Sequence, residues 1–455
     1  MDDMHYLLAD LQTGRVNRRG FIKRALASGV SLGGITAMLQ SCGSGSGGSG
    51  PTSITWATWG NTGEIARFQA FTKKYNTDHK ANAKLVPIPD YNDYGAKILT
   101  ELNGGVGPDV FYAGDTQIAK FIQTQTIVDL TSLLSSSKSQ EKASDFNQGL
   151  WGAARTKGGK IYGVPTDCNP HVLWYNKKVL QEAGITDDPA MLSSQGQWTR
   201  DAFMTMLEKI HAKGKYGFIL DDEPSRFWNW ATAYGGRIYD DNGFGNFIVQ
   251  DDPISLDTMS WLVSGVRSKL ITFGATLPKG QGDDLAFMGD QVAFVAAGRW
   301  YLPEFRVTNG LQYDIVPYPS KSGKIGPVNI STAYIVLNKH SKQQDAAFDF
   351  LTNFVSSAGQ TFRLQGGGNA VPSVNGADDV VLSGNNPAHA STFLEARNVG
   401  YALFSAEMGT PGLTDDIKTA LEPVWLQGAD LKTALGKVAL MANPRIQQAQ
   451  SQLNA

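Results

Sequence analysis

Residues 53–60, SITWATWG, open the stretch of sequence that decides the fold class. Their β-branched and aromatic side chains are typical of a strand, which Gly60 ends. The following segment, Glu64–Tyr75, places apolar residues at helical spacing and predicts an amphipathic helix. The alternation continues with a strand at Lys84–Ile88, a helix at Asp93–Leu102 and a strand at Asp109–Tyr112. This β-α-β-α-β order predicts a parallel α/β sheet.

A second α/β region is expected after Gly163. Its predicted strands are Val172–Tyr175, Val292–Ala296 and Tyr334–Leu337, and its predicted helices are Lys177–Ala183, Thr199–Lys213, Phe227–Tyr234 and Gln343–Val355. We interpret Tyr239–Gly243 as a hairpin turn, because it lacks the acidic spacing of a calcium loop. Ligands of open α/β sheets bind outside the carboxyl ends of strands. Residues 59–61 and 112–115 are therefore candidate site positions.

The composition excludes several classes of protein. The chain has 455 residues, enough for about two or three domains. Its hydrophobic share of 42% is normal for a globular chain once glycine is added. Lys+Arg 40 against Asp+Glu 42 leaves no basic excess for binding nucleic acid. The only cysteines, Cys42 and Cys168, exclude a cysteine-rich zinc site and a disulfide scaffold.

The N-terminus reads as an export and anchoring signal. Arg18-Arg19 followed by Gly20 and Phe21 resembles the twin-arginine export signal. The weakly apolar run at 25–39 is too short to span a bilayer as a mature helix. It leads into LQSC at 39–42, which resembles a bacterial lipobox.

Lipidation of Cys42 would follow from that motif. We expect residues 1–41 to be removed, Cys42 to be lipidated and residues 42–52 to serve as a Gly/Ser tether. The alternative is a plain signal anchor with an incidental cysteine.

Several short motifs follow one another in the body of the chain. They are PDVFYAGD at 108–115, YGVP at 162–165, WYNK at 174–177, FMGDQVAF at 287–294, GRW at 298–300, AYIV at 333–336 and AAFDFL at 346–351. Their order, together with the lipobox and tether, resembles the family 1 extracellular solute-binding proteins of ABC importers, relatives of the maltose-binding protein. The resemblance runs from about residue 53 to residue 455.

The resemblance implies an α/β fold of two lobes, the type II periplasmic-binding-protein fold, with the ligand cleft between them. The expected N-lobe comprises 53–165 and about 330–372, and the expected C-lobe comprises about 166–329 and 373–455. The chain would cross between lobes near Val164–Val172, near Val328–Tyr334 and near Val371–Asn375. Closure around a ligand would be a hinge motion sensed by the membrane permease.

The resemblance also implies a function. We expect a lipid-anchored extracytoplasmic receptor, monomeric and without a cofactor, that captures a sugar or oligosaccharide and delivers it to an ABC permease. Scattered histidines do not support a metal site, and no Walker A motif is present, so a cytoplasmic ATPase partner would supply ATP hydrolysis. We expect no nucleic-acid partner and no catalysis.

Candidate ligand-binding residues combine aromatic rings, which suit the apolar faces of sugars, with polar groups that suit hydroxyls. In relatives, an aromatic residue and an aspartate matching Tyr112 and Asp115 contact sugar, and a tryptophan matching Trp300 stacks on it. The stretch Pro411–Thr414 lacks the aromatic residue that relatives place there. The full set is Trp59, Asn61, Tyr112, Asp115, Asp167, Asn169, Glu223, Trp228, Arg299, Trp300, Asn329 and Ser331.

The sequence also allows other interpretations. Trp228 lies in a predicted helix, where a tryptophan is more often part of the core. A receptor for glycerol-3-phosphate, a polyol or another polar solute would use Arg299 or Arg363 for a phosphate. A surface glycosidase would need a pair of carboxylates across the sugar, for which Asp283-Asp284 and Asp221-Asp222-Glu223 are available.

Overall fold

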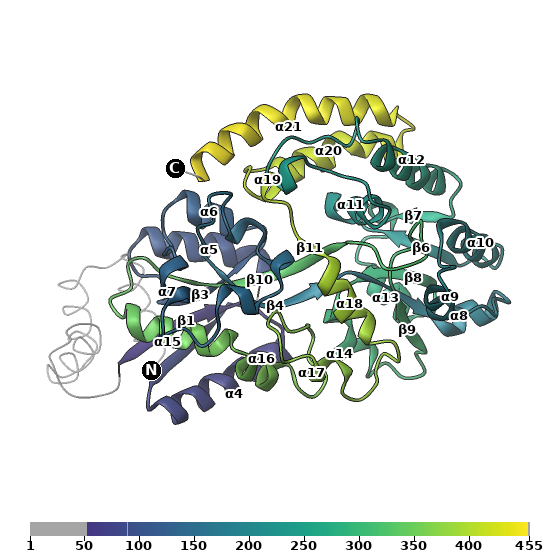
Figure 1. The fold of residues 1–455 in the computed structure, drawn as a ribbon. Helices are drawn as coiled ribbons and strands as arrows, with labels where there is room; N and C mark the ends of the chain where they lie inside the picture. Colours follow the sequence, from purple (N-terminus) through teal and green to yellow (C-terminus); the bar gives the residue numbers. More distant parts are fainter. Residues whose placement is uncertain (1–51, 89, 454–455) are drawn as a thin grey trace, which may run out of the picture. The chain divides into compact units, whose positions relative to one another are not determined.

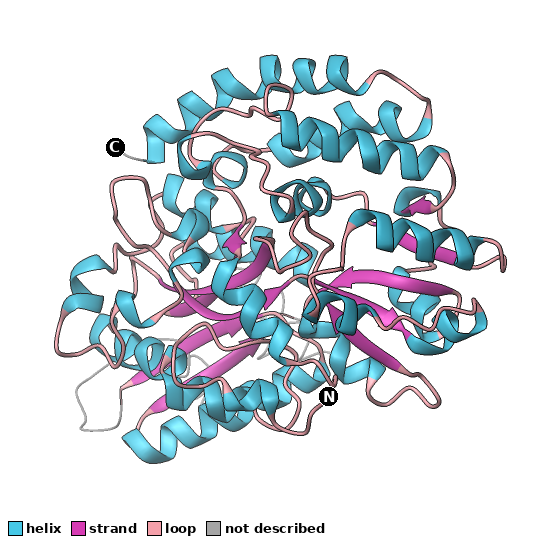
Figure 2. Ribbon diagram, turned by 45° about the vertical axis from the view of Figure 1, so that its right-hand side comes forward, coloured by secondary structure: helices cyan, strands magenta, loops and turns pink. Residues whose placement is uncertain are grey.

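A computed structural model describes residues 52–88 and 90–453 (Figure 1). The predicted export signal, Cys42 and most of the tether lie outside the described residues. The residues described form one compact unit. Its strands lie in two sheets, and helices flank both (Figure 2).

The first sheet has six strands and contains the predicted β-α-β-α-β segment. Its strands are β1 (Ser53–Thr58), β2 (Asn82–Pro87), β3 (Val110–Gly114), β4 (Val164–Pro170), β10 (Asn329–Leu337) and β11 (Tyr401–Ala402). Strand β1 pairs in parallel with β2 and β3, as predicted. Strand β10 is longer than the predicted Tyr334–Leu337 and belongs to this first sheet rather than to the second α/β region, because it pairs antiparallel with both β3 and β4.

The second sheet has five strands in the order β7-β6-β8-β5-β9. They are β5 (Val172–Asn176), β6 (Tyr216–Leu220), β7 (Ile271–Phe273), β8 (Val292–Ala297) and β9 (Tyr313–Val316). Strand β6 pairs in parallel with β7 and β8, while β5 is antiparallel to β8 and β9. We call the parts of the chain packed on the first and second sheets the first and second lobes.

Helices make up most of the remaining structure. They are α4 (Thr62–His79), α5 (Tyr91–Asn103), α6 (Ile118–Gln123), α7 (Thr131–Ser135), α8 (Lys177–Glu182), α9 (Pro189–Ser194), α10 (Arg200–His211), α11 (Pro224–Ala233), α12 (Pro253–Arg267), α13 (Asp283–Met288), α14 (Leu302–Phe305), α15 (Gln344–Val355), α16 (Ser357–Leu364), α17 (Asp379–Leu382), α18 (Ser391–Val399), α19 (Ser405–Met408), α20 (Leu413–Leu426) and α21 (Leu431–Leu453). Single 3₁₀ turns occur at Ala143–Asp145, Gln148–Leu150, Gly152–Ala154, Asp241–Gly243, Gly274–Thr276 and Arg299–Tyr301. No helix described between residues 52 and 453 is both long and apolar enough to cross a membrane.

Local sequence explains where several helices begin. Asn61 caps α4 in a capping box, in which its Oδ1 accepts from the Glu64 N–H at 3.0 Å and its own N–H donates to the Glu64 carboxylate. Thr199 caps α10, as its position before the helical pattern predicts. The predicted turn at Tyr239–Gly243 is a single 3₁₀ turn, flanked by an isolated bridge between Tyr239 and Phe247.

The chain passes from the first sheet to the second at His171, between β4 and β5, and returns between β9 and β10. The first passage lies within the predicted crossing at Val164–Val172, whereas the second, residues 317–328, precedes most of the predicted crossing at Val328–Tyr334, so the division into lobes stays a prediction. Near the third predicted crossing, Val371 forms an isolated bridge with Cys168, and Val374 forms one with Phe146.

Three apolar clusters form the core. One belongs to the first lobe, and one joins the second lobe to α20 and α21. The third lies mainly on the second sheet and extends to β4 and β10 of the first, where it includes Cys168, whose thiol is fully buried. Leu453, at the end of α21, packs in the first-lobe cluster, so this helix contacts both lobes. Many tryptophans are core residues: Trp56, Trp174, Trp198, Trp228 and Trp230 are fully buried.

Candidate functional site

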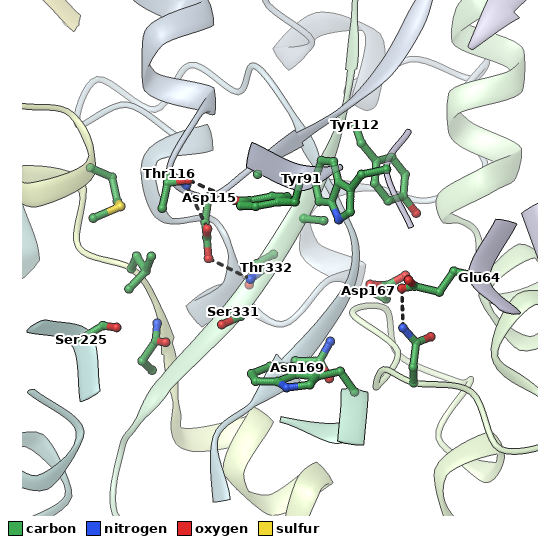
Figure 3. A pocket seen from close by; sticks show the side chains of 18 of the residues that line it. Glu64, Tyr91, Tyr112, Asp115, Thr116, Asp167, Asn169, Ser225, Ser331 and Thr332 are labelled. Carbon is green, nitrogen blue, oxygen red and sulfur yellow. Dashed lines mark hydrogen bonds between the residues drawn. The ribbon is translucent and has the colours of Figure 1, made fainter. Parts of the chain in front are cut away.

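A cavity of about 720 Å³ lies where the lobes meet (Figure 3). Residues of the first sheet line it together with residues from α11, the turn at Arg299–Tyr301 and the C-terminal helices. The predicted site residues that line it are Trp59, Tyr112, Asp115, Asp167, Asn169, Glu223, Trp300, Asn329 and Ser331. The structure thus brings together residues that span most of the chain.

The other predicted residues do not line the cavity, for three separate reasons. Asn61 is exposed and serves as the cap of α4. Trp228 is 1% exposed in the second-lobe core, as the alternative interpretation expected, and its Nε1–H donates to Glu407 at 3.2 Å. Arg299 is also 1% exposed, and its guanidinium donates to the carbonyl oxygens of Gly368 and Ala370.

The burial of Arg299 changes the pKa of its guanidinium group. Burial and the nearby charges of Arg67 and Arg306 lower the pKa of Arg299 to about 10. Because its guanidinium donates to backbone carbonyls, it does not face the cavity.

Aromatic rings form the first-lobe wall of the cavity. Trp59 follows β1 and meets Tyr91 and Tyr112 edge-to-face, with ring centroids 5.0 and 5.2 Å apart. The ring centroid of Phe68 from α4 lies 5.5 Å from that of Tyr112. Because each ring is held by its neighbours, the wall is an apolar surface already shaped before a ligand arrives.

Trp300 provides an aromatic side chain from the second lobe. Its ring contacts His171 edge-to-face, with 5.2 Å between centroids. Two residues earlier, Gly298 leaves room for it, because a Cβ at Gly298 would collide with the Trp300 ring and with the Asn169 Cβ. The motif of a glycine, one residue and a tryptophan therefore has a steric basis.

Asp167 and Glu64 form an acidic corner at one end of the cavity (Figure 3). Asp167 binds the buried guanidinium of Arg363 at 3.0 Å, and Arg363 also donates to the Thr166 carbonyl at 2.8 Å. Glu64 accepts from the Asn369 amide, and burial raises its pKa. Arg67 lies nearby and donates to the Asn369 Oδ1 at 3.1 Å.

His171, in the passage from β4 to β5, contacts Ser331 of β10, which lines the cavity. The His171 Nε2 and Ser331 Oγ are 3.0 Å apart. Burial and the adjacent Arg226 hold the pKa of His171 well below its usual value, so the imidazole stays neutral. Asn329, 1% exposed, lines the same cavity, and neither its Oδ1 nor its Nδ2 has a partner among the described residues. Buried polar atoms without partners are rare and point to a missing ligand or water.

Asp115 directly follows β3 and lines the cavity from the first lobe. Its carboxylate accepts from the N–H groups of Thr116 at 2.9 Å and Thr332 at 3.3 Å. Burial raises the pKa of Asp115 to about 6, although these hydrogen bonds act in the opposite direction.

The remaining end of the cavity is lined by Glu223, Glu407 and Thr414. Lys418 from α20 binds Glu223 at 3.0 Å. Glu407 accepts from Trp228, Tyr239 and Thr414, and burial raises its pKa. In the stretch without an aromatic residue, Thr414 alone of 411–414 reaches the cavity.

Several cavity residues were not predicted as site residues from the sequence, among them Glu64, Arg67, Tyr91, Arg226 and Glu407, and Arg363 was considered only as a ligand of a phosphate. Glu64 was detectable as the third residue after a helix-capping asparagine, a position that turns its carboxylate back toward the loop after β1. Arg363 and Glu407 had no local signal, because their partners Asp167 and Trp228 lie 196 and 179 residues away.

Comparison with known proteins identifies the family. The family model for bacterial extracellular solute-binding proteins matches residues 59–361, which is more than half of the chain. The chain belongs to the bacterial extracellular solute-binding proteins. The family consists of binding proteins, in agreement with a cavity at the junction of two lobes.

Individual relatives of this solute-binding protein are distant. An uncharacterized lipoprotein from the oleD 5′ region of Streptomyces antibioticus is 26% identical over 269 residues, and the match covers 56% of each chain. The diacetylchitobiose binding protein DasA of Streptomyces coelicolor is 26% identical, with 72% of this chain and 77% of DasA covered.

A solved structure shares the fold. It is an ABC substrate-binding protein of Listeria monocytogenes in complex with cycloalternan, which superposes with a TM-score of 0.73 at 20% identity. The superposition covers 87% of this chain and 98% of that chain.

Proposed function

We propose that this solute-binding protein captures a sugar or oligosaccharide and delivers it to an ABC permease. The observation that carries the proposal is the composition of the cavity, in which Trp59 and Trp300 from different lobes accompany the unpartnered carboxamide of Asn329. Rings suit the apolar faces of sugars, and a carboxamide with a free donor and a free acceptor suits hydroxyls. The ligands named for DasA and for the Listeria protein agree with this chemistry.

Of the alternatives, a phosphate receptor receives less support. Both arginines considered for it are engaged: Arg299 donates to backbone carbonyls outside the cavity lining, and Arg363 is paired with Asp167. A glycosidase also receives less support, because Asp222 and Glu223 share an ion pair with Lys418, at 3.0 Å from each. Asp283 accepts from Tyr301 at 2.6 Å, away from the cavity lining.

The wider assignment belongs to the same proposal. A twin-arginine signal would export the chain, and a lipid on Cys42 would anchor it to the outer face of the cell membrane. The receptor would be monomeric, and a cytoplasmic ATPase would drive its permease. The lobes would divide as predicted from the sequence and close by rotation about β4–β5 and β9–β10. Mass spectrometry of membrane-extracted protein tests the lipid, with Cys42→Ala as the variant expected in the soluble fraction.

The direct test is a titration of the full-length chain in mild detergent, followed by tryptophan fluorescence and thermal unfolding. The panel contains mono- and oligosaccharides, polyols and glycerol phosphates. A ligand at 100 times its Kd adds about 2.7 kcal/mol to the free energy of unfolding. A sugar hit supports the proposal, whereas a hit restricted to glycerol phosphates overturns it.

Trp300→Ala then locates the site. Loss of a stacking ring should weaken a bound sugar by about 2 kcal/mol, or roughly thirtyfold. Tyr216→Ala is the matched control, because Tyr216 is a 36% exposed aromatic residue of the second lobe that does not line this cavity. Equal losses of affinity in the two variants would show that the ligand does not bind in this cavity.

A further inference from the structure

The cavity contains carboxylates that the protein does not neutralise. Asp167 and Glu223 are paired with Arg363 and Lys418, each at 3.0 Å. Glu64, Asp115 and Glu407 also line the cavity, but none makes an ion pair with any residue of 52–88 or 90–453.

The arginines do not balance this excess. Arg67 makes one hydrogen bond, to the neutral amide of Asn369, and no ion pair with a described residue. Arg226 lies against His171 and is 3.6 Å from Asp221, so part of its charge is already compensated. Unpaired carboxylates therefore outnumber unpaired guanidinium groups along the described lining, which favours a ligand carrying positive charge.

Asp115 is the carboxylate best placed to meet such a ligand. Glu407 already accepts from three side chains, and Glu64 faces the charge of Arg67. Asp115 accepts only from backbone N–H groups, those of Thr116 and Thr332, so lone pairs of both carboxylate oxygens stay free for a donor.

Aromatic rings stand beside Asp115. The Tyr91 hydroxyl is 3.1 Å from the Oγ1 of Thr116, the next residue after Asp115, and Figure 3 shows the three side chains together. Trp59 lies 5.0 Å from Tyr91 between ring centroids. A carboxylate next to aromatic rings is the arrangement that recognises ammonium groups, because the ring quadrupoles attract a cation.

An independent observation shows that this cavity is built for a ligand. Asn329 is 1% exposed and starts β10, the strand that also holds Thr332. Its carboxamide has neither donor nor acceptor satisfied by the described residues. A hydroxyl-bearing molecule would satisfy both atoms, while an ammonium on the same molecule would meet Asp115.

We propose that the saccharide captured by this protein carries a protonated amine, with Asp115 as its counter-ion and the rings of Tyr91 and Trp59 beside the ammonium. The inference rests on the proposed function, since it names the class of sugar taken by the same cavity. The ligand class is an amino sugar or aminocyclitol in its unacetylated form.

The test compares ligands that differ in one group. Calorimetric titrations of the full-length chain at pH 7 use glucosamine, N-acetylglucosamine and glucose, and then chitobiose, N,N′-diacetylchitobiose and cellobiose. A charged hydrogen bond in a partly buried site should make the free amine at least tenfold tighter than its acetylated and hydroxyl counterparts.

Asp115→Asn tests the assigned residue. The measured quantity is the ratio of amine to hydroxyl affinity, which should fall to near one whatever happens to binding overall. Asp187→Asn is the matched control, because Asp187 is exposed, lies outside the cavity lining and carries the same charge. The ratio should not change in this control. Thermal unfolding of both variants shows that they fold.

The pH profile provides a second readout. Asp115 must be ionised to hold the ammonium, and its pKa in the free protein is about 6. Amine affinity should be full at pH 7 and fall about tenfold per unit below pH 6. The charged and titratable groups facing Asp115 are Arg226, Tyr91 and Tyr334, and none of these changes charge in that range. Asp115→Asn should remove the slope.

The outcomes separate the two proposals. An amine preference that Asp115→Asn abolishes supports the inference. Equal or weaker binding of the amine beside a neutral sugar that binds overturns the inference and leaves the proposed function standing. An amine preference that survives in Asp115→Asn overturns the assignment of the counter-ion. Silence from amines and from the neutral panel overturns both.

Discussion

Two ion pairs at the cavity have the same nitrogen–oxygen distance of 3.0 Å but very different surroundings. In the pair of Arg363 and Asp167 the side chains are 1% and 16% exposed, whereas in the pair of Lys418 and Glu223 they are 36% and 44% exposed. Water therefore screens the second pair and not the first. The comparison teaches that burial rather than distance decides how much each pair matters to the fold.

The largest expected effect comes from breaking the buried pair. Arg363→Met leaves Asp167 without its partner in a poorly solvated position and should lower the free energy of unfolding by about 3–5 kcal/mol. Urea denaturation of the full-length chain measures it. A loss of free energy of unfolding below about 1 kcal/mol is typical of an exposed pair. Such a result would show that water reaches Asp167 and that the two pairs do not differ.

A double variant separates the charge from the packing. Asp167→Asn combined with Arg363→Met removes the unpaired carboxylate and should recover a large part of the loss in the single variant, since leaving a buried charge alone is the main penalty. The same denaturation series measures it. A double variant as unstable as the single one would assign the loss to packing of the guanidinium on Phe354, where the two lie 3.9 Å apart.

Asp115 extends the comparison to a carboxylate without any ion pair. Its pKa is raised to about 6 in the folded chain, so the folded state binds this proton more tightly than the unfolded state. Asp115 therefore costs stability at pH 7, and the cost fades as the pH falls toward 4.

Asp115→Asn should remove that cost. We expect the variant to be about 2–3 kcal/mol more stable than the parent at pH 7, with a difference that shrinks as the pH falls below about 6. Thermal melts across this range measure it. A variant that is less stable at pH 7 would contradict the direction of the shift.

The smallest effect is expected for the exposed pair. Lys418→Met should change the free energy of unfolding by less than about 1 kcal/mol, and added salt should shrink the difference further. Melts at low and high ionic strength measure both. A change as large as that of Arg363→Met would show that Glu223 and Asp222 depend on Lys418 more than their exposure suggests.

The sequence predicted the fold where local pattern is sufficient. Strand and helix alternation after residue 53 gave the parallel pairing of β1 with β2 and β3. The antiparallel place of β10 could not be predicted from pattern alone, because its partners β3 and β4 are far away in the sequence.

The candidate site shows the same limit. Trp300 and Trp228 were both candidates, and only Trp300 reaches the cavity. Trp300 follows a strand and a glycine, so its position at the end of a strand can be predicted from the sequence. Trp228 lies in a helix with Phe227 and Trp230, where apolar side chains point to several sides and the buried face cannot be chosen. The hydrogen bond between Trp228 and Glu407 could not be predicted, because the two residues are far apart in the sequence.

The buried thiol of Cys168 has a practical consequence for optical work. Burial raises the pKa of this thiol, and its Sγ lies against the Pro372 carbonyl at 3.8 Å. Maleimide dyes react with exposed thiolates, so Cys168 would stay unlabelled in the native protein. A cysteine introduced at an exposed position of each lobe would accept a fluorophore without first replacing Cys168. Energy transfer between two such dyes would follow the distance between the lobes, one molecule at a time.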